Sequence, residues 1–383
     1  MSVMIIGGGI GGFALAQLLR ETDIESIVIE RAPTFRALGH FIALKGAGVR
    51  VLDHLGVRES CAARSQPEQA MNFYTRSGRL LRRQESRVVD AALGGFMMMR
   101  RADLIAALYE RIQGAVDVRF GLEAATLQET DAGVEVTLSN GAIERVDAVI
   151  GADGIHSRTR RQVFGESGVT PLGGCYIALE VDCDHDFRDT ACFLARGRTV
   201  AAIPSAPGRL AVVVYHCTTD DLRARLSTPR AAREFFAREY ADFAPTVRAV
   251  FAAIDADSFI YVDNISMVRL PAIARGRIAL LGDAAACPTF LSGMGSAYAM
   301  VSAEVLAQEL ARTSDVTAAL GAYSAKASSL ASNMQRSALQ ARGLVLQPTR
   351  WKAALRDGAL ALAPGPWFMD LIRRFYGEQL TTA

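Results

Sequence analysis

The sequence predicts an α/β fold: a parallel sheet with helices, a second β-sheet inserted into it, and helices at the C-terminal end. Three observations lead to this prediction. An apolar segment at residues 3–6 meets a glycine cluster, and a helical pattern follows it up to Arg20. Apolar strands that run into a glycine turn recur at 147–151 and 277–282. Several strand-like segments lie between these two, so a separate sheet is expected there.

The individual elements follow from the local patterns. Residues 24–30 supply a second β-rich segment, so the first thirty residues fit one βαβ unit. We expect helices at 47–55, 101–112, 296–312 and 316–344, and strands at 116–120, 123–127, 134–138, 175–181, 191–194, 199–203 and 210–216. The predicted domains are 1–170 with 262–345, then 171–261 as the β-sheet substrate domain, and 346–383 as a C-terminal helical segment.

Composition narrows the class of protein. The 383 residues are 50% hydrophobic, and 42 basic and 40 acidic residues are mixed along the chain, so a large core is expected and nucleic acid is not an expected partner. The apolar N-terminus has no basic residue before Arg20 and is broken by glycines, unlike a secretion signal. The six cysteines are far apart and suggest reduced thiols rather than a metal site. We expect a soluble, cytoplasmic monomer or homodimer without stable membrane association.

A glycine fingerprint lies between the first strand and helix. Gly7 permits a tight turn, Gly9 lets the backbone approach a pyrophosphate, and Gly12 allows close packing of helix and strand. Glu30 ends the second strand and can accept hydrogen bonds from both ribose hydroxyls of an adenosine. A carboxylate there also repels a 2′-phosphate, so the site suits FAD or NAD. The fingerprint alone does not separate these two.

Three further segments resemble motifs of one family. They are Arg101 to Leu104, Gly151 to Arg160, and Gly282-Asp283-Ala284-Ala285 followed by Pro288 and Gly293-Met294-Gly295. With the fingerprint and Glu30-Arg31-Ala32-Pro33, Arg36 and Gly39, they extend from residue 3 to about residue 310. In this order they resemble the class A flavoprotein monooxygenases, the group of the para-hydroxybenzoate hydroxylases and the tetracycline-inactivating monooxygenases.

The resemblance implies a Rossmann-like FAD-binding domain of the GR2 type with an inserted β-sheet substrate domain. It implies non-covalent FAD, NAD(P)H as co-substrate, and hydroxylation of an aromatic or polycyclic small molecule by O₂ through a flavin C4a-hydroperoxide. Arg101 would lie near the pyrophosphate and ribityl region, Asp283 would bind the ribityl chain, and the glycine turn after it would approach the flavin pyrimidine ring. The implied cofactor-binding residues are Gly7, Gly9, Gly12, Glu30, Arg31, Arg36, Arg101, Asp153, Arg160, Asp283, Gly293, Met294 and Gly295.

One loop departs from the family pattern. Ala286 stands where relatives usually have histidine, and Cys287-Pro288-Thr289-Phe290 replaces or shifts a proline pair. Because the flavin carries the redox chemistry, no catalytic side chain is assigned. Candidate substrate contacts are Tyr176, Phe193, Tyr215, His216 and Phe290. The alternative is core packing for the four aromatic residues and a polar strand position for His216.

Other reactions remain open from sequence. Baeyer–Villiger oxidation or epoxidation would use the same fold, as would a flavin-binding protein or cyclase without oxygenase turnover. A halogenase is disfavoured, because Trp351 and Trp367 both lie near the C-terminus rather than in a tryptophan motif in the middle of the chain. The chain has a single glycine fingerprint, which fits single-component enzymes that nicotinamide visits transiently.

Overall fold

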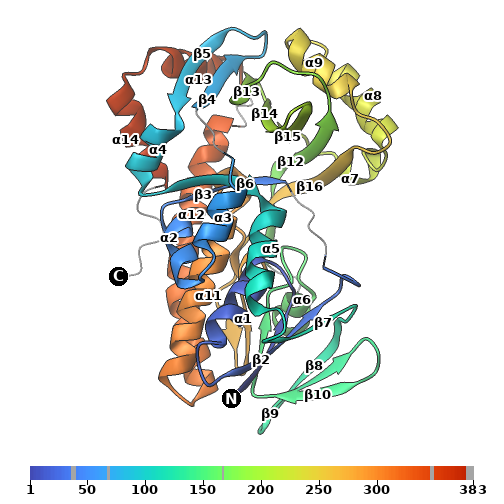
Figure 1. The fold of residues 1–383 in the computed structure, drawn as a ribbon, viewed down its shortest axis with the longest axis vertical. Helices are drawn as coiled ribbons and strands as arrows, with labels where there is room; N and C mark the ends of the chain where they lie inside the picture. Colours follow the sequence, from blue (N-terminus) through green and yellow to red (C-terminus); the bar gives the residue numbers. More distant parts are fainter. Residues whose placement is uncertain (36–39, 67–69, 166–167, 346–348, 377–383) are drawn as a thin grey trace.

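The computed structural model describes residues 1–35, 40–66, 70–165, 168–345 and 349–376. Figure 1 shows the N-terminal strands and their helices in the lower half of the molecule and a second sheet in the upper half. The long helix α12 (Val316–Val345) extends from the lower half toward the upper one. The mixture of a parallel sheet, an inserted sheet and C-terminal helices confirms the predicted fold class.

The first sheet has six strands among the described residues, in the order β17-β18-β11-β1-β2-β7. Strand β1 pairs in parallel with β11 on one side and with β2 on the other. The unit formed by β1, α1 and β2 is therefore the predicted βαβ unit. The bounds are β1 (Ser2–Ile6), α1 (Ile10–Leu19), β2 (Glu25–Glu30), β7 (Asp117–Phe120), β11 (Ala148–Gly151), β17 (Ala274–Arg275) and β18 (Ile278–Leu280).

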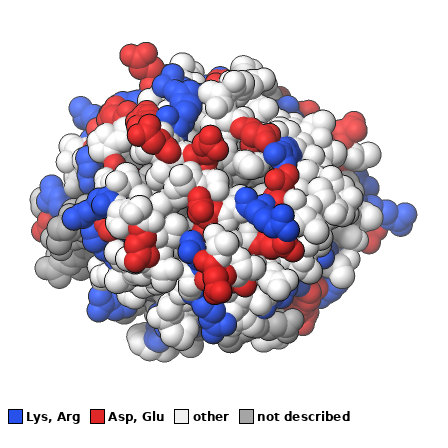
Figure 2. Space-filling view, turned by 90° about the horizontal axis from the view of Figure 1, so that it is seen from below, with Lys and Arg blue, Asp and Glu red and all other residues white. Residues whose placement is uncertain are grey.

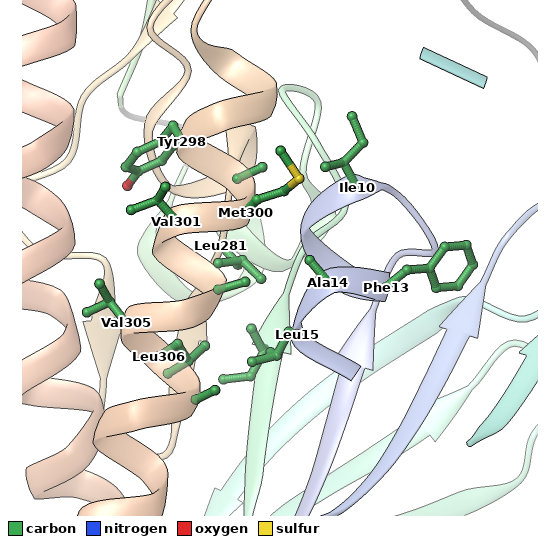
Figure 3. Close-up of a cluster of buried hydrophobic side chains, with 14 of the residues drawn as sticks. Ile10, Phe13, Ala14, Leu15, Leu281, Tyr298, Met300, Val301, Val305 and Leu306 are labelled. Carbon is green, nitrogen blue, oxygen red and sulfur yellow. The ribbon is translucent and has the colours of Figure 1, made fainter. Parts of the chain in front are cut away.

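Helices cover this sheet and form its main core. Helix α1 packs against α5 (Arg101–Ile112) and α11 (Gly295–Arg312). Figure 3 shows side chains of α1 and α11 facing one another across Leu281. A Cβ at Gly11 would lie 3.4 Å from Leu281 Cδ2, so the small residue permits this close approach. The Tyr323 hydroxyl of α12 donates a hydrogen bond to the Leu280 carbonyl over 2.8 Å, which ties α12 to β18.

The second sheet has seven strands among the described residues, in the order β16-β12-β15-β14-β13-β4-β5. One face packs its aliphatic side chains on helices α7 to α9, and the other face packs on β3, β6, η1 and α12. The bounds are β4 (Ala70–Thr75), β5 (Leu80–Glu85), β12 (Val169–Asp182), β13 (Thr190–Ala195), β14 (Arg198–Ala206), β15 (Arg209–His216), β16 (Phe259–Val268), α7 (Leu222–Arg225), α8 (Pro229–Glu239) and α9 (Pro245–Ala252).

Two strands of the second sheet come from a part of the chain that the predicted division placed in the first domain. Strand β4 pairs in parallel with β13, and β5 pairs with β4. Residues 70–85 therefore lie in the second sheet, while the remaining boundaries stay a prediction. The pairing joins residues more than a hundred positions apart, so local patterns could not indicate it.

The remaining elements connect or flank the two sheets. Strands β8 to β10 form a small sheet at the lower end, and α13 and α14 lie beside β5 at the upper end (Figure 1). Their bounds are β3 (Phe41–Lys45), α2 (Ala47–His54), α3 (Arg58–Arg64), α4 (Ser86–Leu93), β6 (Phe96–Arg100), β8 (Ala124–Thr130), β9 (Gly133–Leu138), β10 (Ile143–Val146), α6 (Arg158–Phe164), α10 (Asp283–Ala286), η1 (Phe290–Ser292), α13 (Arg350–Leu362) and α14 (Gly365–Tyr376).

The surface matches the mixed charge of the sequence. Figure 2 shows basic and acidic side chains interspersed over the lower face of the molecule, without a large area of one sign. Within the described ranges, no helix is long and apolar enough to cross a bilayer.

Candidate functional site

The glycine turn between β1 and α1 has room only for glycine at two positions. Gly7 has a φ of +117°, and a Cβ there would lie 2.5 Å from the Ala152 carbonyl oxygen. A Cβ at Gly12 would lie 2.0 Å from the Gly7 carbonyl oxygen. At Gly9, by contrast, Arg101 Nη2 at 3.8 Å is the only atom of the described residues within 4 Å of an added Cβ. The backbone of the turn is therefore open at Gly9, at the N-terminus of α1.

Glu30 is held by one backbone amide of that turn and by one that follows β2. Its Oε2 accepts a hydrogen bond from the Gly8 N–H over 2.7 Å, and its Oε1 accepts one from the Ala32 N–H over 2.8 Å. Each oxygen keeps a second lone pair for a hydroxyl donor. The carboxylate is thus fixed at the end of β2 in an orientation that suits the two hydroxyls of a ribose.

Arg101 supplies a cation opposite the glycine turn. It is the first residue of α5, and its backbone N–H donates to the His40 carbonyl over 2.9 Å. Its guanidinium lies beside Gly9, where the free amides of α1 also point. A helix N-terminus facing an arginine favours an anion, and a pyrophosphate fits this position by charge.

Asp283 begins α10 directly after the β18 strand. Its Oδ1 is buried and has no hydrogen-bond partner among the described residues. Burial raises the pKa of Asp283 above its ordinary value, while the positive charge of Arg101 opposes that rise. An unpaired buried acceptor is costly, and a hydroxyl-bearing ligand would satisfy it. The residues present therefore fit the ribityl chain that the resemblance implies.

The glycine turn before α11 lies close to Asp283. Gly293 has a φ of +60°, and a Cβ on Gly295 would lie 3.5 Å from Asp283 Oδ1. The Met294 N–H donates to Ser292 Oγ over 3.0 Å, so this amide is already used within the turn. Gly295 is the first residue of α11, and the amides of that first turn form the positive end of the helix.

Asp153 and Arg160 shape the loop after β11. Asp153 accepts hydrogen bonds from Ser157 Oγ at 2.5 Å, the Arg158 N–H at 2.8 Å and the Thr159 N–H at 3.1 Å, and so caps α6. Arg160 is buried and donates from Nη1 to the Ala284 carbonyl over 3.0 Å. These contacts are internal to the protein. A direct role in nucleotide binding stays a prediction for both residues.

Arg31 and Arg36 are two further predicted cofactor-binding residues. The Arg31 side chain is 80% exposed and pairs with Glu123 at 3.5 Å, so its role in cofactor binding stays a prediction. Arg36 lies outside the described residues. The side chain of Phe290 is likewise outside the described part, although its backbone begins η1.

Tyr176 and Tyr215 are brought together on the face of the second sheet that packs on β3, β6, η1 and α12. Their rings are 5.6 Å apart, and the His40 ring lies 5.1 Å from Tyr176 and 6.3 Å from Tyr261. Burial lowers the pKa of His40 to about 3, so its ring is neutral, with the charge of Arg101 adding to the effect. Arg101 also acts electrostatically on Tyr176. We call His40, Tyr176, Tyr215 and Tyr261 the aromatic cluster.

Phe193 and His216 project from the opposite face of the same sheet. Phe193 stacks on Tyr74 at 5.1 Å, and His216 Nδ1 lies 3.0 Å from the Tyr240 hydroxyl. Both belong to or contact the core under α7 to α9. Alternate residues of a strand face opposite sides, so neighbouring positions such as Tyr215 and His216 separate in this way. The core-packing alternative therefore describes these two residues.

Cys287 follows α10, in the loop that departs from the family pattern. Burial raises the pKa of its thiol well above the ordinary value, with the nearby Asp283 charge adding to the rise. A thiol held protonated is a poor nucleophile.

Asp263 is a residue that the motif search did not find. It lies on β16 and is 2% exposed, and its carboxylate has partners from three separate segments of the chain. The only signal in the sequence is an acid within the apolar pattern of residues 259–268. A charge buried within such a strand requires partners.

Comparison with known proteins agrees with this geometry. The profile of a family described as FAD binding domain matches residues 1–338. The chain is 29% identical over 343 residues to the FAD-dependent urate hydroxylase of Klebsiella pneumoniae subsp. pneumoniae, with 85% of each protein covered. It is 26% identical over 327 residues to a flavin-dependent monooxygenase of an unknown prokaryotic organism, with 84% of each covered.

A solved structure is similar over nearly the whole chain. Klebsiella pneumoniae HpxO, complexed with FAD and uric acid, matches with a TM-score of 0.86 and 25% identity, covering 99% of this chain and 97% of that one. The family match, the shared fold and the site around Glu30, Arg101 and Asp283 agree with one another. The chain therefore belongs to the FAD binding domain family and, within it, to the class A FAD-dependent monooxygenases.

Proposed function

We propose that this protein is an NAD(P)H- and O₂-dependent hydroxylase of an electron-rich aromatic or polycyclic small molecule. The observation that carries the proposal is the position of the aromatic cluster. It lies on the sheet face that meets the first domain, within the electrostatic reach of Arg101. Aromatic walls suit a flat ring substrate.

The residues of the first domain would hold FAD along its length. Glu30 would accept hydrogen bonds from the ribose hydroxyls, and the pyrophosphate would lie between the turn at Gly9 and Arg101. Asp283 Oδ1 would accept a hydrogen bond from the ribityl chain. The first turn of α11 at Gly295 would stabilise negative charge on the pyrimidine end of the reduced ring. FAD itself supplies the activation of O₂ and the transfer of one oxygen atom.

NAD(P)H would bind transiently near the flavin rather than in a domain of its own. The sequence has one glycine fingerprint, which we assign to FAD, so NAD(P)H has no fingerprint of its own. Hydride transfer to the flavin therefore needs a transient approach from the surface.

The similar proteins favour a polar ring as substrate. One relative is named a urate hydroxylase, and the matching solved structure was determined with uric acid. For this chain we infer only the broader class of an electron-rich ring with an ionisable hydroxyl. Substrate specificity would depend on side chains of the second sheet, which lie outside the motifs shared with the family.

The test is a substrate screen with the purified FAD-loaded protein. NADH or NADPH oxidation and O₂ uptake are followed with phenolic and polycyclic hydroxylated compounds, and products are weighed by mass spectrometry. The proposal expects NAD(P)H oxidation stimulated by substrate and a product heavier by one oxygen atom. A product with an oxygen inserted into a ring ketone would identify Baeyer–Villiger oxidation instead. Flavin binding with neither O₂ uptake nor NAD(P)H oxidation would contradict the proposal.

A further inference from the structure

A cavity of about 340 Å³ lies between α10, α12 and the segment that follows β16. Its lining includes no member of the aromatic cluster, and it includes none of Glu30, Arg101 and Asp283. The cavity is therefore separate from the flavin contacts and the substrate contacts described above. Its volume is near the lower end of the range for ligand pockets, about 300–1,000 Å³, so it suits a small molecule.

The inner wall of the cavity is aliphatic. Val268 and Ile273 are buried and line it on one side, and Ala331 of α12 lines it on the other. Ala286, at the end of α10, completes this wall. Ala286 stands where relatives usually have histidine, and the smaller side chain leaves more room between α10 and α12. This wall favours a ligand with an apolar body.

Two arginines line the same cavity at its exposed side. Arg269 follows β16, and Arg336 belongs to α12. Arg269 Nε donates to Gln335 Oε1 over 2.9 Å, and Arg336 Nη2 donates to Asn333 Oδ1 over 2.5 Å. Neither guanidinium pairs with a carboxylate of the described residues, and no acidic residue among them lines the cavity. The charge of the lining therefore favours an anion.

Arg269 is held in a fixed orientation. Gln335, which accepts from its Nε, is buried and donates from Nε2 to the Val268 carbonyl over 2.7 Å. The backbone N–H of Arg269 donates to the Gly168 carbonyl over 2.7 Å. Both terminal nitrogens of the guanidinium stay available to a ligand. A planar pair of N–H donors of this kind suits the two oxygens of a carboxylate.

A hydroxyl of α12 adds a third polar group. Ser328 lines the cavity, and its Oγ is buried without a hydrogen-bond partner among the described residues. Ser332, one turn further along the helix, donates to the Ser328 carbonyl over 2.9 Å and is thereby satisfied. An unpaired buried hydroxyl is costly, and an oxygen of a ligand in the cavity can accept its hydrogen bond.

We propose that this cavity is a second ligand site, which binds the carboxylate of a small acid with a branched aliphatic body. The carboxylate lies between Arg269 and Arg336, and the aliphatic body lies on the wall formed by Val268 and Ile273. The inference goes beyond the proposed hydroxylation and does not depend on it, because the site shares no residue with the flavin or substrate contacts.

The acid and FAD bind at the same time. Asp283 and Ala286 are the two ends of the short helix α10, and only Ala286 of these two lines the cavity. The Val268 N–H donates to the Cys287 carbonyl over 3.2 Å, which joins the cavity wall to the segment after α10. The ligand therefore lies next to the flavin loop without occupying the position proposed for the ribityl chain.

The experiment measures binding to the FAD-loaded protein by isothermal titration calorimetry. The probe is 4-methylpentanoate, an acid without a ring. Its amide has the same body without the charge, and acetate has the charge without the body. The variants are Arg269→Gln, Arg336→Gln and Ser328→Ala. Arg342→Gln is the matched control, because Arg342 is an exposed arginine of α12 that does not line the cavity. Bound FAD and thermal unfolding are measured first.

We expect 4-methylpentanoate to bind the wild-type protein at least about 10-fold more tightly than the amide or acetate. Arg269→Gln and Arg336→Gln should each raise its dissociation constant by about 10-fold or more, since each removes a charged donor. Ser328→Ala should raise it by roughly 2- to 10-fold without lowering the unfolding temperature, because the lost hydroxyl is unpaired in the free protein. Arg342→Gln should bind as wild type, and added NaCl should weaken binding.

Several results would overturn the inference. They are absence of 4-methylpentanoate binding to the FAD-loaded wild type, equal binding of the amide or of acetate, and wild-type affinity in both Arg269→Gln and Arg336→Gln. Binding that Tyr176→Leu weakens and the arginine variants do not would place the probe in the aromatic cluster and likewise exclude the site. If an arginine variant loses FAD or unfolds, the wild-type comparison of acid with amide and the Ser328→Ala affinity decide.

These outcomes are independent of the hydroxylase screen. The calorimetry needs neither NAD(P)H nor O₂, so a protein that oxygenates no ring can still bind the acid. Conversely, an active hydroxylase that does not bind 4-methylpentanoate would refute the second site alone.

Discussion

Arg160 Nη1 donates a hydrogen bond of 3.0 Å to the carbonyl of Ala284, and this contact joins the loop after β11 to the helix that carries Asp283. Arg160 also donates from Nη2 to the Ile155 carbonyl over 2.5 Å. Two segments more than a hundred residues apart are thereby held at fixed positions around the site. Arg160 therefore has a structural role, and its contact with a nucleotide stays a prediction.

Replacement of Arg160 by methionine should therefore lower stability. The change removes two hydrogen bonds from a charged donor and leaves buried carbonyls unpaired, so we expect the free energy of unfolding to fall by about 2–4 kcal/mol. Urea denaturation followed by circular dichroism measures it. The control is Arg158→Met on the same helix, whose exposed ion pair with Glu123 should contribute less than about 1 kcal/mol. Equal losses of unfolding free energy in Arg160→Met and Arg158→Met would contradict this structural role of Arg160.

Glu30 should contribute to FAD affinity rather than to the fold alone. The variant Glu30→Ala removes the acceptor for the ribose hydroxyls, and loss of hydrogen bonds to a charged group costs about 1.5–3 kcal/mol. We expect the dissociation constant of FAD to rise by roughly 10- to 100-fold. Titration of the apoprotein with FAD, followed by flavin fluorescence, measures this. Glu25→Ala, at the exposed start of the same strand, should leave the affinity unchanged.

Asp283 should make the apoprotein less stable as the pH rises. Burial raises the pKa of Asp283, so the folded state binds a proton more readily than the unfolded state. Stability is then highest below the ordinary carboxyl pKa and falls as the pH rises through the folded-state pKa. We expect apoprotein Asp283→Asn to lose less stability than wild type between acidic and neutral pH. Thermal unfolding across that range tests this, with exposed Asp23→Asn following the wild type. The same pH dependence in Asp283→Asn would contradict the prediction.

Two glycines should respond to alanine in opposite ways. A Cβ at Gly12 would lie 2.0 Å from the Gly7 carbonyl oxygen, so Gly12→Ala must displace the turn and should abolish FAD binding. Gly321 lies within α12, and no atom of the described part of the chain is within 4 Å of an added Cβ. Gly321→Ala should raise the free energy of unfolding by about 0.5–1 kcal/mol. FAD content after purification and denaturation curves measure the two effects. A Gly12→Ala protein that binds FAD normally would show that the turn relaxes.

The sequence predicted the parts of this structure that depend on local pattern. The helix expected at 101–112 matches α5, and the fingerprint around Gly12 forms the expected turn. These features follow from side-chain periodicity and from glycine geometry within a few residues. Asp283 follows β18 of the first sheet, whereas Arg101 follows β6, which pairs with β3 in a separate two-stranded sheet. Their electrostatic contact therefore depends on tertiary packing, which local pattern does not predict.

Features that depend on distant pairing could not be predicted in this way. The register of β12 with β16 places Asp263 beside Tyr176, and no motif marks Asp263. The sequence analysis grouped Tyr215 and His216 as substrate contacts, whereas the folded sheet places them on opposite faces; which face packs on β3, β6, η1 and α12 depends on how the whole sheet is covered. The use of the Met294 amide by Ser292 likewise depends on the folded turn.

The two faces of the second sheet provide the last prediction. Tyr176 and Phe193 are both buried aromatic residues of this sheet, but Tyr176 belongs to the cluster facing the first domain and Phe193 to the core under α7 to α9. Tyr176→Leu and Phe193→Leu should each lower the free energy of unfolding by about 1–3 kcal/mol, because each replaces a packed ring by a smaller side chain.

Only one of these variants should change catalysis. Tyr176→Leu removes a ring from the proposed substrate site, so we expect kcat/KM for the aromatic substrate to fall by about tenfold or more, equivalent to about 1.4 kcal/mol of transition-state stabilisation. Phe193→Leu should retain the wild-type kcat/KM at a temperature where both proteins are folded. Steady-state NAD(P)H oxidation with varied substrate measures both values. If Phe193→Leu lowers kcat/KM as much as Tyr176→Leu does, the substrate does not bind on the face of the sheet proposed above.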